Sequence, residues 1–330
     1  MSTLSTQPEG ESVLGRRLKP GAGVPRKRAK GRAVWEEQPS FIGQFGKGAV
    51  LTVVVLAVVL PLYAIILTSL SSEGAITRAG GSLVLVPDGL SLSAYREIFA
   101  NGVVTRAVVV SFGITAVGTA VSMTLSILCA YGLSRARSVG HGFFLGMMIF
   151  TMFFSGGLIP GFLVVTQLHG YDQYWALILP SCISVFNILI MRGFYQATAR
   201  DLIDAARIDG AGEWRILWSV VLPTTKAVTA VMTLFYAVGY WGSWFNTLLY
   251  TPFDNSKWPL SYVLYEYVNL GAKMPGMDSG GSGADIQHQA AAPFAISMAV
   301  VVLTLIPILV VYPFLQKHFT KGMLTGAIKG

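Results

Sequence analysis

The most strongly patterned polar residues lie in the stretch DAARIDGAGEWRILWSVVLP, which begins at Asp204. In a helix, residues spaced i, i+3, i+4 and i+7 share one face. Four residues here have that spacing: Leu202, Ala205, Ala206 and Asp209. The two alanines at the centre would let another surface approach closely, with charge at the edge. The pattern predicts docking into a groove of another protein, and the alternative is a loop that packs on its own helices.

Neighbouring residues predict where this short helix begins and ends. Thr198, followed three residues later by Asp201, fits a capping box. Gly210 and Gly212 favour its termination. A second amphipathic piece follows, and Pro223 ends it before the next apolar run.

Other patterns that would support catalysis or ligand binding are absent from the sequence. The four histidines have no metal-ligand spacing, and Cys129 and Cys182 lie in apolar runs, as small core residues do. The chain has no phosphate-binding Gly-Lys-Ser/Thr loop. Its long apolar runs are nearly free of Asp and Glu, which argues against a membrane enzyme and an ion-coupled secondary transporter. We expect no metal, no cofactor and no catalytic residue.

The composition indicates that these residues belong to a membrane protein. The 330-residue chain is 53% hydrophobic and 12% charged, whereas about a quarter of the residues of a soluble domain are charged. Six segments can cross a bilayer core as helices, which takes about 20 residues each. They are residues 49–70, 106–133, 142–166, 174–195, 226–250 and 293–315. The expected class is an all-α integral membrane protein with six transmembrane helices.

The distribution of basic residues predicts the orientation. With the N-terminus in the cytosol, 19 of the 24 Lys and Arg residues lie on the cytosolic side, as the positive-inside rule requires. Both termini are then cytosolic, and the net charge of +8 needs no nucleic-acid partner. Residues 1–48 are expected to be a disordered basic tail near anionic lipid, with a secretory signal peptide as the weaker alternative.

The spans and loops define the domain organisation. The transmembrane domain covers residues 49–315, and the stretch quoted above lies in a cytosolic loop at 196–225. Outer loops are expected at 71–105 and at 251–292, the latter with the Gly-rich run GMDSGGSGAD. A cytosolic tail covers residues 316–330.

Two spans have features beyond apolarity. The second has a stripe of small residues every four positions, which favours close helix packing, static or sliding. The stripe consists of Gly118, Ser122, Ser126 and Ala130. The third contains FFSGGLIPG at 153–161, where glycines and a proline predict a simple kink or freed backbone near a translocation path.

The loop stretch resembles a known motif. Asp204-Ala205-Ala206, three residues, Gly210, nine residues and Val220-Val221-Leu222-Pro223 match the spacing of the coupling motif of ABC importer permeases, usually written EAA, three residues, G, nine residues, I, any residue, LP. Asp204 stands where the motif has Glu, and Ala199 stands where a proline is usual. Further segments resemble carbohydrate permeases related to the second permease subunit of the maltose importer. They are SAYREIF, FFSGGLIP, YWALILP, FYAVGYW and the C-terminal YPFLQKHFTKGMLTGAIKG.

This resemblance implies a type I ABC importer permease in a prokaryotic cytoplasmic membrane. The chain would pair with a second permease subunit above two ATPase subunits, which use ATP and Mg²⁺, and a sugar-binding protein would deliver an oligosaccharide. An importer of amino acids or peptides is the alternative. The residues implied to couple to the ATPase are Asp204, Ala205, Ala206, Asp209, Gly210, Leu222 and Pro223. The implied ATPase contacts of the tail are Gln316, Lys317, Gly322 and Gly326, the alternative being a plain positive-inside tail.

Contacts with the sugar are sought among aromatic and amide side chains. Rings stack on pyranose faces and amides bind hydroxyls, but Trp and Tyr near helix ends also serve as interfacial anchors. Asn187, near the middle of its span, could bind the substrate or a neighbouring helix. The candidates are Asn187, Tyr240, Trp241, Trp244 and Asn246.

Overall fold

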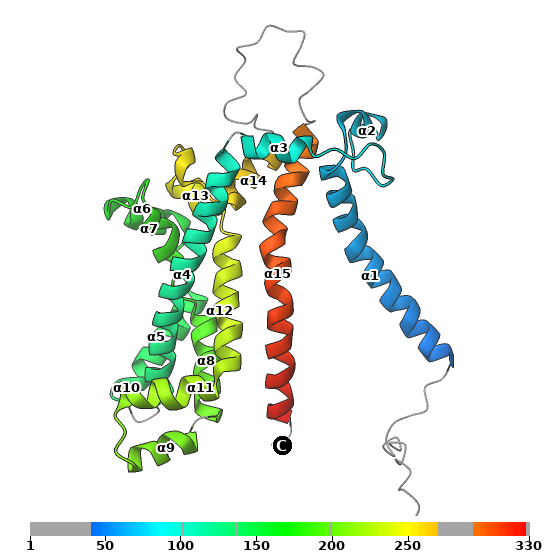
Figure 1. Ribbon diagram of the computed structural model, residues 1–330. Coiled ribbons are helices and arrows are strands. Elements are labelled where there is room, and N and C mark those ends of the chain that lie inside the picture. The colour runs from blue at the N-terminus through cyan, green and yellow to red at the C-terminus, as the bar shows by residue number, and fades with distance from the viewer. Residues whose placement is uncertain (1–40, 101, 136–137, 199, 270–292, 328–330) are drawn as a thin grey trace, which may run out of the picture. The chain divides into compact units, whose positions relative to one another are not determined.

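The computed structural model describes residues 41–100, 102–135, 138–198, 200–269 and 293–327 (Figure 1). Within these ranges the regular structure is helical, apart from an isolated bridge between Ser71 and Leu90. The chain divides into two compact units, residues 1–56 and 57–330. The described residues of the first unit form the beginning of α1, and the site described below lies in the second unit. The expected all-α class is confirmed.

Three helices are long and apolar enough to cross a bilayer: α1 (Phe41–Ser69), α4 (Val103–Leu133) and α15 (Pro293–Ala327). They cover the first, second and sixth predicted spans. Helix α1 already begins at Phe41, so residues 41–48 are helical and only residues 1–40 of the predicted tail lie outside the described chain. Helix α15 has no break at Pro307 or Pro313 and continues into the predicted tail.

The third predicted span is two helices, α5 (His141–Phe153) and α6 (Leu158–Gln167), at 114° to each other. The kink or freed backbone predicted within the span over 142–166 is therefore a full break between two helices, and FFSGGLIPG correctly marked its place. Helix α5 ends at Phe153, because Phe154 takes an extended conformation, and Gly157, the N-cap of α6, has a φ of +85°, which favours glycine. Pro160 then lies in the first turn of α6, where no intrahelical N–H is needed.

The fourth and fifth predicted spans are also interrupted. The fourth consists of α7 (Tyr174–Ile178), the 3₁₀ turn η1 (Leu179–Ser181) and α8 (Val185–Thr198), with a bend of 51°. The fifth is not one helix over 226–250, because α12 (Lys226–Trp241) ends at Gly242 and α13 (Phe245–Tyr250) follows separately. With each bent pair of helices taken as one span, the described residues supply up to six spans.

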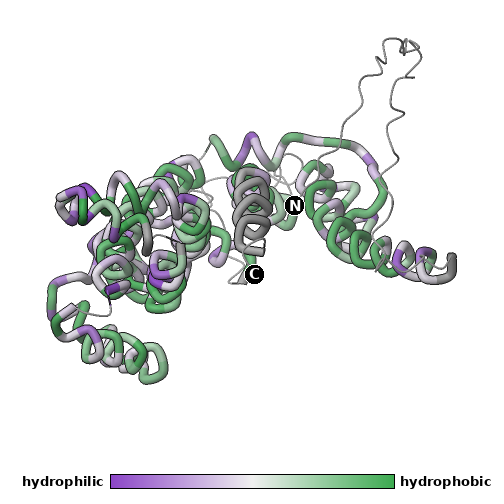
Figure 2. Tube along the Cα trace, turned by 90° about the horizontal axis from the view of Figure 1, so that it is seen from below, coloured by the Kyte–Doolittle hydropathy of each residue, from purple (hydrophilic) through white to green (hydrophobic). Residues whose placement is uncertain are grey.

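Both predicted outer loops contain short helices. Residues 71–105 include α2 (Glu73–Arg78) and α3 (Ser93–Ala100), and the second loop contains the 3₁₀ turn η3 (Asn255–Lys257) and α14 (Leu260–Asn269). The Gly-rich run at 276–285 lies outside the described residues. Hydrophobic residues cover much of the helical trace, and hydrophilic residues fall into shorter stretches (Figure 2).

The small-residue stripe of α4 packs against α12. A Cβ atom on Gly118 would lie 2.8 Å from ring atoms of Tyr240. One helical turn further, Ser122 Oγ lies 2.9 Å from Tyr240 Oη, and Ser126 Oγ lies 2.7 Å from Tyr236 Oη. The prediction of close helix contact along this stripe is confirmed. The small side chains leave room for buried hydroxyl pairs between the two helices.

Lys257 connects two loops at the end of α12 remote from the coupling stretch. Its Nζ donates to Asp172 O at 2.8 Å and lies 3.0 Å from Asp172 Oδ1 and 2.9 Å from Asp254 Oδ2. Ser256 donates its N–H and its hydroxyl to Asp254 Oδ1 at 3.0 and 2.6 Å. Hydrogen bonds from Ser256 and then from Lys257 lower the pKa of Asp254 to about 2.

This ion cluster should weaken on acidification. Because the folded-state pKa of Asp254 is depressed, its stabilising contribution is complete above its ordinary pKa of about 4 and is lost as the pH falls through about 2. We expect the difference in thermal stability between wild type and Asp254→Asn to be constant above about pH 4 and to shrink below it. Thermal unfolding of both proteins in detergent, repeated across this range of pH, measures the difference in thermal stability. A difference that grows on acidification would contradict the assignment.

Candidate functional site

Helix α9 (Arg200–Ile208) presents most of the predicted docking face to the surface. Leu202, Ala205 and Asp209 are exposed, and Ile208 beside them is 87% exposed. On the other side, Ile203 is buried in the core of the second unit. The exposed part of the predicted face is therefore available to a partner, because Ile203 attaches the helix to its own bundle from another side.

Ala206 departs from the predicted arrangement. Its side chain is half-buried and packs against the same core as Ile203. The two alanines thus have different roles, since Ala205 forms part of the exposed face while Ala206 lets α9 lie close to the bundle. The capping box predicted at Thr198 and Asp201 involves side chains outside the described ones.

Gly210 ends α9 in a left-handed conformation, with a φ of +78°. Its N–H donates to Arg207 O at 3.0 Å, and the N–H of Ala211 donates to Ala206 O at 2.9 Å. These two bonds are those of a Schellman C-cap, in which glycine avoids the steric cost of a Cβ atom. The glycine of the motif is thus explained by backbone geometry, because nothing lies within 4 Å of the position a Cβ would take.

The segment that follows anchors the loop and turns the chain into the span. It comprises α10 (Glu213–Ile216), the π-helical segment η2 (Leu217–Val221) and α11 (Leu222–Thr224), and it meets α12 at 86°. Its buried side chains are Ile216, Leu217 and Val221.

Of the two last residues of the motif, Leu222 packs against the core and Pro223 is exposed. Pro223 has no N–H to continue the ladder of hydrogen bonds. The hydroxyls of Thr224 and Thr225 donate to Val220 O and Val221 O at 2.7 and 2.6 Å. These bonds satisfy carbonyls at the helix end, so the chain can turn sharply there.

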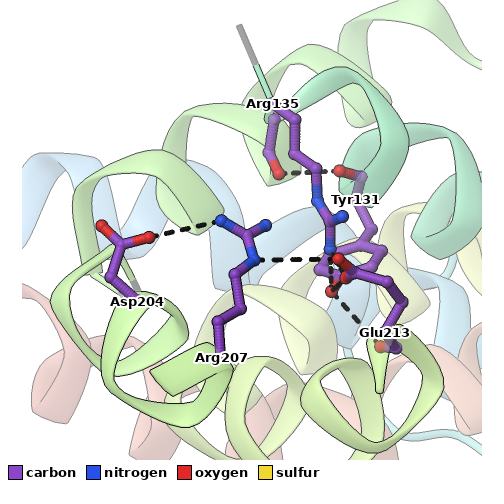
Figure 3. A network of polar contacts seen from close by, with 6 residues as sticks. Tyr131, Arg135, Asp204, Arg207 and Glu213 are labelled. Atoms are coloured by element: carbon purple, nitrogen blue, oxygen red, sulfur yellow. Dashed lines mark hydrogen bonds and ion pairs between the residues drawn. The ribbon is translucent and has the colours of Figure 1, made fainter. Parts of the chain in front are cut away.

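A network of ionic and polar contacts connects α9 with the end of α4 (Figure 3). Arg207 lies 3.3 Å from Asp204 Oδ1 and 3.7 Å from Glu213 Oε1. The second carboxylate oxygen of Glu213 accepts from Tyr131 Oη at 2.7 Å and from Arg135. The proximity of Tyr131, Arg135 and Glu213 was not predicted, because it depends on the tertiary fold.

A cavity of about 670 Å³ lies between the α7–α8 break and α12. Its polar lining includes Asn187 and Tyr240, two of the predicted substrate-pathway residues, whose role in the pathway stays a prediction. The full lining is Ser181, Ser184, Asn187, Leu234, Phe235, Tyr236, Val238, Gly239, Tyr240 and Ser243. The serines were not predicted, and the only signal for Ser181 and Ser184 was their position around a Pro-containing interruption.

The tyrosines of this cavity also satisfy backbone groups of the broken helix. Tyr240 Oη donates to Ile178 O at 3.1 Å, and Tyr236 Oη accepts from the N–H of Ser184 at 3.1 Å. Backbone groups freed inside a membrane must find partners in the protein or in a wet cavity. The two phenol hydroxyls therefore satisfy backbone groups at the break and also form hydrogen bonds with serines of α4.

The other predicted pathway residues lie elsewhere. Trp241 is buried in a hydrophobic cluster with residues of α4, α14 and α15, away from the cavity, and its indole donates to Thr304 O at 2.9 Å. Trp244 stacks on Tyr265 with ring centroids 4.4 Å apart. Asn246 donates to the hydroxyl of Ser181 at 3.1 Å, so it supports the wall of the cavity from outside. None of these three is part of the cavity lining.

The predicted ATPase contacts of the tail fall on the last part of α15. Its backbone is helical through Ala327. The side chains of Gln316 and Lys317 lie outside the described ones, and the positions of Gly322 and Gly326 are likewise not part of the described surface. The role of the tail stays a prediction.

Together, the interrupted apolar helices and the polar cavity among them have the features of a membrane permease, and an exposed small-faced helix lies at one end. Residues 122–325 match the model of the family described as "Binding-protein-dependent transport system inner membrane component". The chain belongs to this family.

Relatives with defined names agree with this assignment. The chain is 44% identical over 248 residues, 75% of this chain and 85% of the relative, to the polygalacturonan/rhamnogalacturonan transport system permease protein YtcP of Bacillus subtilis. It is 41% identical to Protein LplC of the same organism over 82% of this chain and 90% of that protein. A chain from a bacterial ABC transporter involved in the import of the acidic polysaccharide alginate has a TM-score of 0.78 at 26% identity, covering 87% of this chain and 100% of that chain.

These findings establish that the chain is an inner-membrane permease component of an ABC transporter and not an enzyme. A binding-protein-dependent system implies a partner permease, an ATPase and a solute-binding protein.

Proposed function

We propose that this permease imports an oligosaccharide by alternating access, as one half of a heterodimer above two ATPase subunits. The observation that carries the proposal is the exposed face of α9, with Ala205 at its centre and the Gly210 cap at its end. In the proposed complex this face docks into one ATPase subunit. The ATPase subunits hold ATP and Mg²⁺, and this chain binds no cofactor.

The proposed topology follows the positive-inside count. Both termini and the loop at 196–225 lie in the cytosol, and the loops at 71–105 and 251–292 face outward. The proposed coupling residues are Asp204, Ala205, Ala206, Asp209, Gly210, Leu222 and Pro223. The tail residues Gln316, Lys317, Gly322 and Gly326 are proposed to reach the ATPase from the end of α15.

The cavity supports a carbohydrate as the substrate. Its lining combines hydroxyls, one carboxamide and aromatic rings, which suits the alternating polar and apolar surfaces of a sugar. Among the described residues its lining contains no Asp or Glu, so a carboxylated sugar would not be repelled there. Because the names of YtcP and the alginate transporter refer to acidic polysaccharides, we propose a uronate-containing oligosaccharide as the substrate class.

Uptake by the complete transporter in proteoliposomes tests the substrate class. Labelled oligogalacturonides should accumulate in the presence of ATP and the cognate solute-binding protein, and neutral malto-oligosaccharides should accumulate less. Amino acids and short peptides should not accumulate. Uptake of a peptide or an amino acid in place of any oligosaccharide would refute carbohydrate import, whereas preference for the neutral sugar would refute only the acidic class.

A further inference from the structure

Helix α9 depends on tertiary contacts for its position. It is a short helix, and an isolated helix of this length is marginal in water. Ile203 and Ala206 supply apolar contact, but both side chains are small or medium-sized. An ionic contact adds to this attachment, through Arg207 on its last turn.

The Glu213 carboxylate lies at the branch point of this attachment. Its Oε1 faces Arg207 of α9, and its Oε2 accepts from Tyr131 and Arg135 at the end of α4. The Arg135 guanidinium also lies over the Tyr131 ring, 4.4 Å from its centroid. One carboxylate thus connects α9 to α4 from opposite sides (Figure 3).

Helix α4 continues this connection to the cavity. The hydroxyls of Ser122 and Ser126 on α4 pair with Tyr240 and Tyr236, which line the cavity from α12. A displacement of α9 that is passed to α4 would therefore reach the cavity wall through direct contacts. If α9 moved independently of α4, its displacement would not reach the cavity wall through these contacts.

At the α4 end, α8 reinforces the same connection. Arg192 Nε donates to Leu133 O at 2.8 Å, and Gln196 Nε2 donates to Ser134 O at 3.0 Å. These bonds satisfy carbonyls at the C-terminus of α4. The end of α4 is thus firmly held, and Glu213 is the described group that joins it to α9 by charge.

We propose that Glu213, with Arg135, is a positioning residue that makes α9 and α4 move as one body when the ATPase pulls on α9. This inference rests on the proposed function of α9 as the coupling helix. The Glu213 and Arg135 side chains are 51% and 26% exposed, and ion pairs this open to solvent contribute little to folding stability. Glu213→Gln should therefore fold and assemble.

The first test measures the oligosaccharide taken up per ATP hydrolysed by the complete transporter in proteoliposomes. In Glu213→Gln we expect the ATPase rate to stay within about twofold, while uptake per ATP falls at least about fivefold, the lower end of typical coupling between sites. Asp88→Asn is the matched control, because it breaks the exposed Arg78–Asp88 pair in an outer loop. It should leave the ratio unchanged.

Arg135→Gln should resemble Glu213→Gln, and the double variant should be no worse than either, because both remove one interaction. Additive losses would show that the two residues act separately and would overturn the pair as the positioning unit.

A second test needs no sugar. Spin labels at Ile208 on α9 and Val109 on α4, both exposed, report the distance between the helices in the complete transporter with and without nucleotide, after replacement of Cys129 and Cys182. The distance distribution should be narrow in wild type and broad in Glu213→Gln. Equally narrow distributions would overturn the inference. Absence of uptake of every oligosaccharide by wild type, with this broadening present, would instead refute the proposed function alone.

Discussion

Ala205→Arg is expected to reduce ATP-driven uptake at least about 100-fold. Ala205 is exposed on α9 at the centre of the proposed docking face, where a long charged side chain would have to be buried against the ATPase. An uncompensated charge at the centre of an interface costs about 3 kcal/mol or more, which corresponds to roughly a 100-fold loss of association. Co-purification of the ATPase with the variant permease and uptake in proteoliposomes measure the effect.

Ser219→Arg is the matched control for this substitution. Ser219 is also exposed in the segment that follows α9, but it lies outside the proposed docking face. Its replacement should leave ATPase binding within about twofold of wild type, as expected of surface substitutions. Wild-type binding and uptake by Ala205→Arg would show that another surface holds the ATPase.

Gly118→Ala is expected to destabilise the permease by about 1–3 kcal/mol through overpacking and to reduce uptake. A Cβ atom at this position would meet the Tyr240 ring at 2.8 Å. The ring cannot turn away freely, because its hydroxyl is bonded to Ser122 and to Ile178 O. The methyl group must therefore separate α4 from α12 or displace a wall of the cavity.

Gly113→Ala on the same helix should have the opposite effect on stability. Nothing lies within 4 Å of its Cβ position, so replacement should stabilise α4 by about 0.5–1 kcal/mol through the higher helix propensity of alanine. Thermal unfolding of the two variants beside wild type gives the comparison. Equal stabilisation by both alanines would show that Gly118 does not set the contact between α4 and α12.

The sequence was sufficient to predict features that depend on local spacing. The apolar runs predicted the helical class, the four-residue repeat from Gly118 predicted the contact of α4, and the motif around Gly210 predicted a short helix with a glycine cap. Each of these depends on residues within a few turns of one another. The break near Gly157 was also predicted, because glycine and proline act on the local backbone.

Features that depend on tertiary contact were not predictable in this way. The 114° bend between α5 and α6 requires knowledge of what α6 packs against. Trp241 was expected beside the pathway, but it is buried in the hydrophobic cluster with α4, α14 and α15, since a helix position alone does not determine which neighbour covers it. Glu213 and Arg135 are far apart in sequence, and their approach depends on how α4, α9 and α10 meet.

The dependence of transport on a separate ATPase is tested most directly by one comparison. Proteoliposomes that contain the permease pair alone, and others that contain the pair with its ATPase subunits, are given the same labelled oligosaccharide, solute-binding protein and internal ATP. The account predicts accumulation only where the ATPase is present, and loss of that accumulation when Ala205→Arg is introduced. Equal accumulation by the permease pair without an ATPase would contradict it.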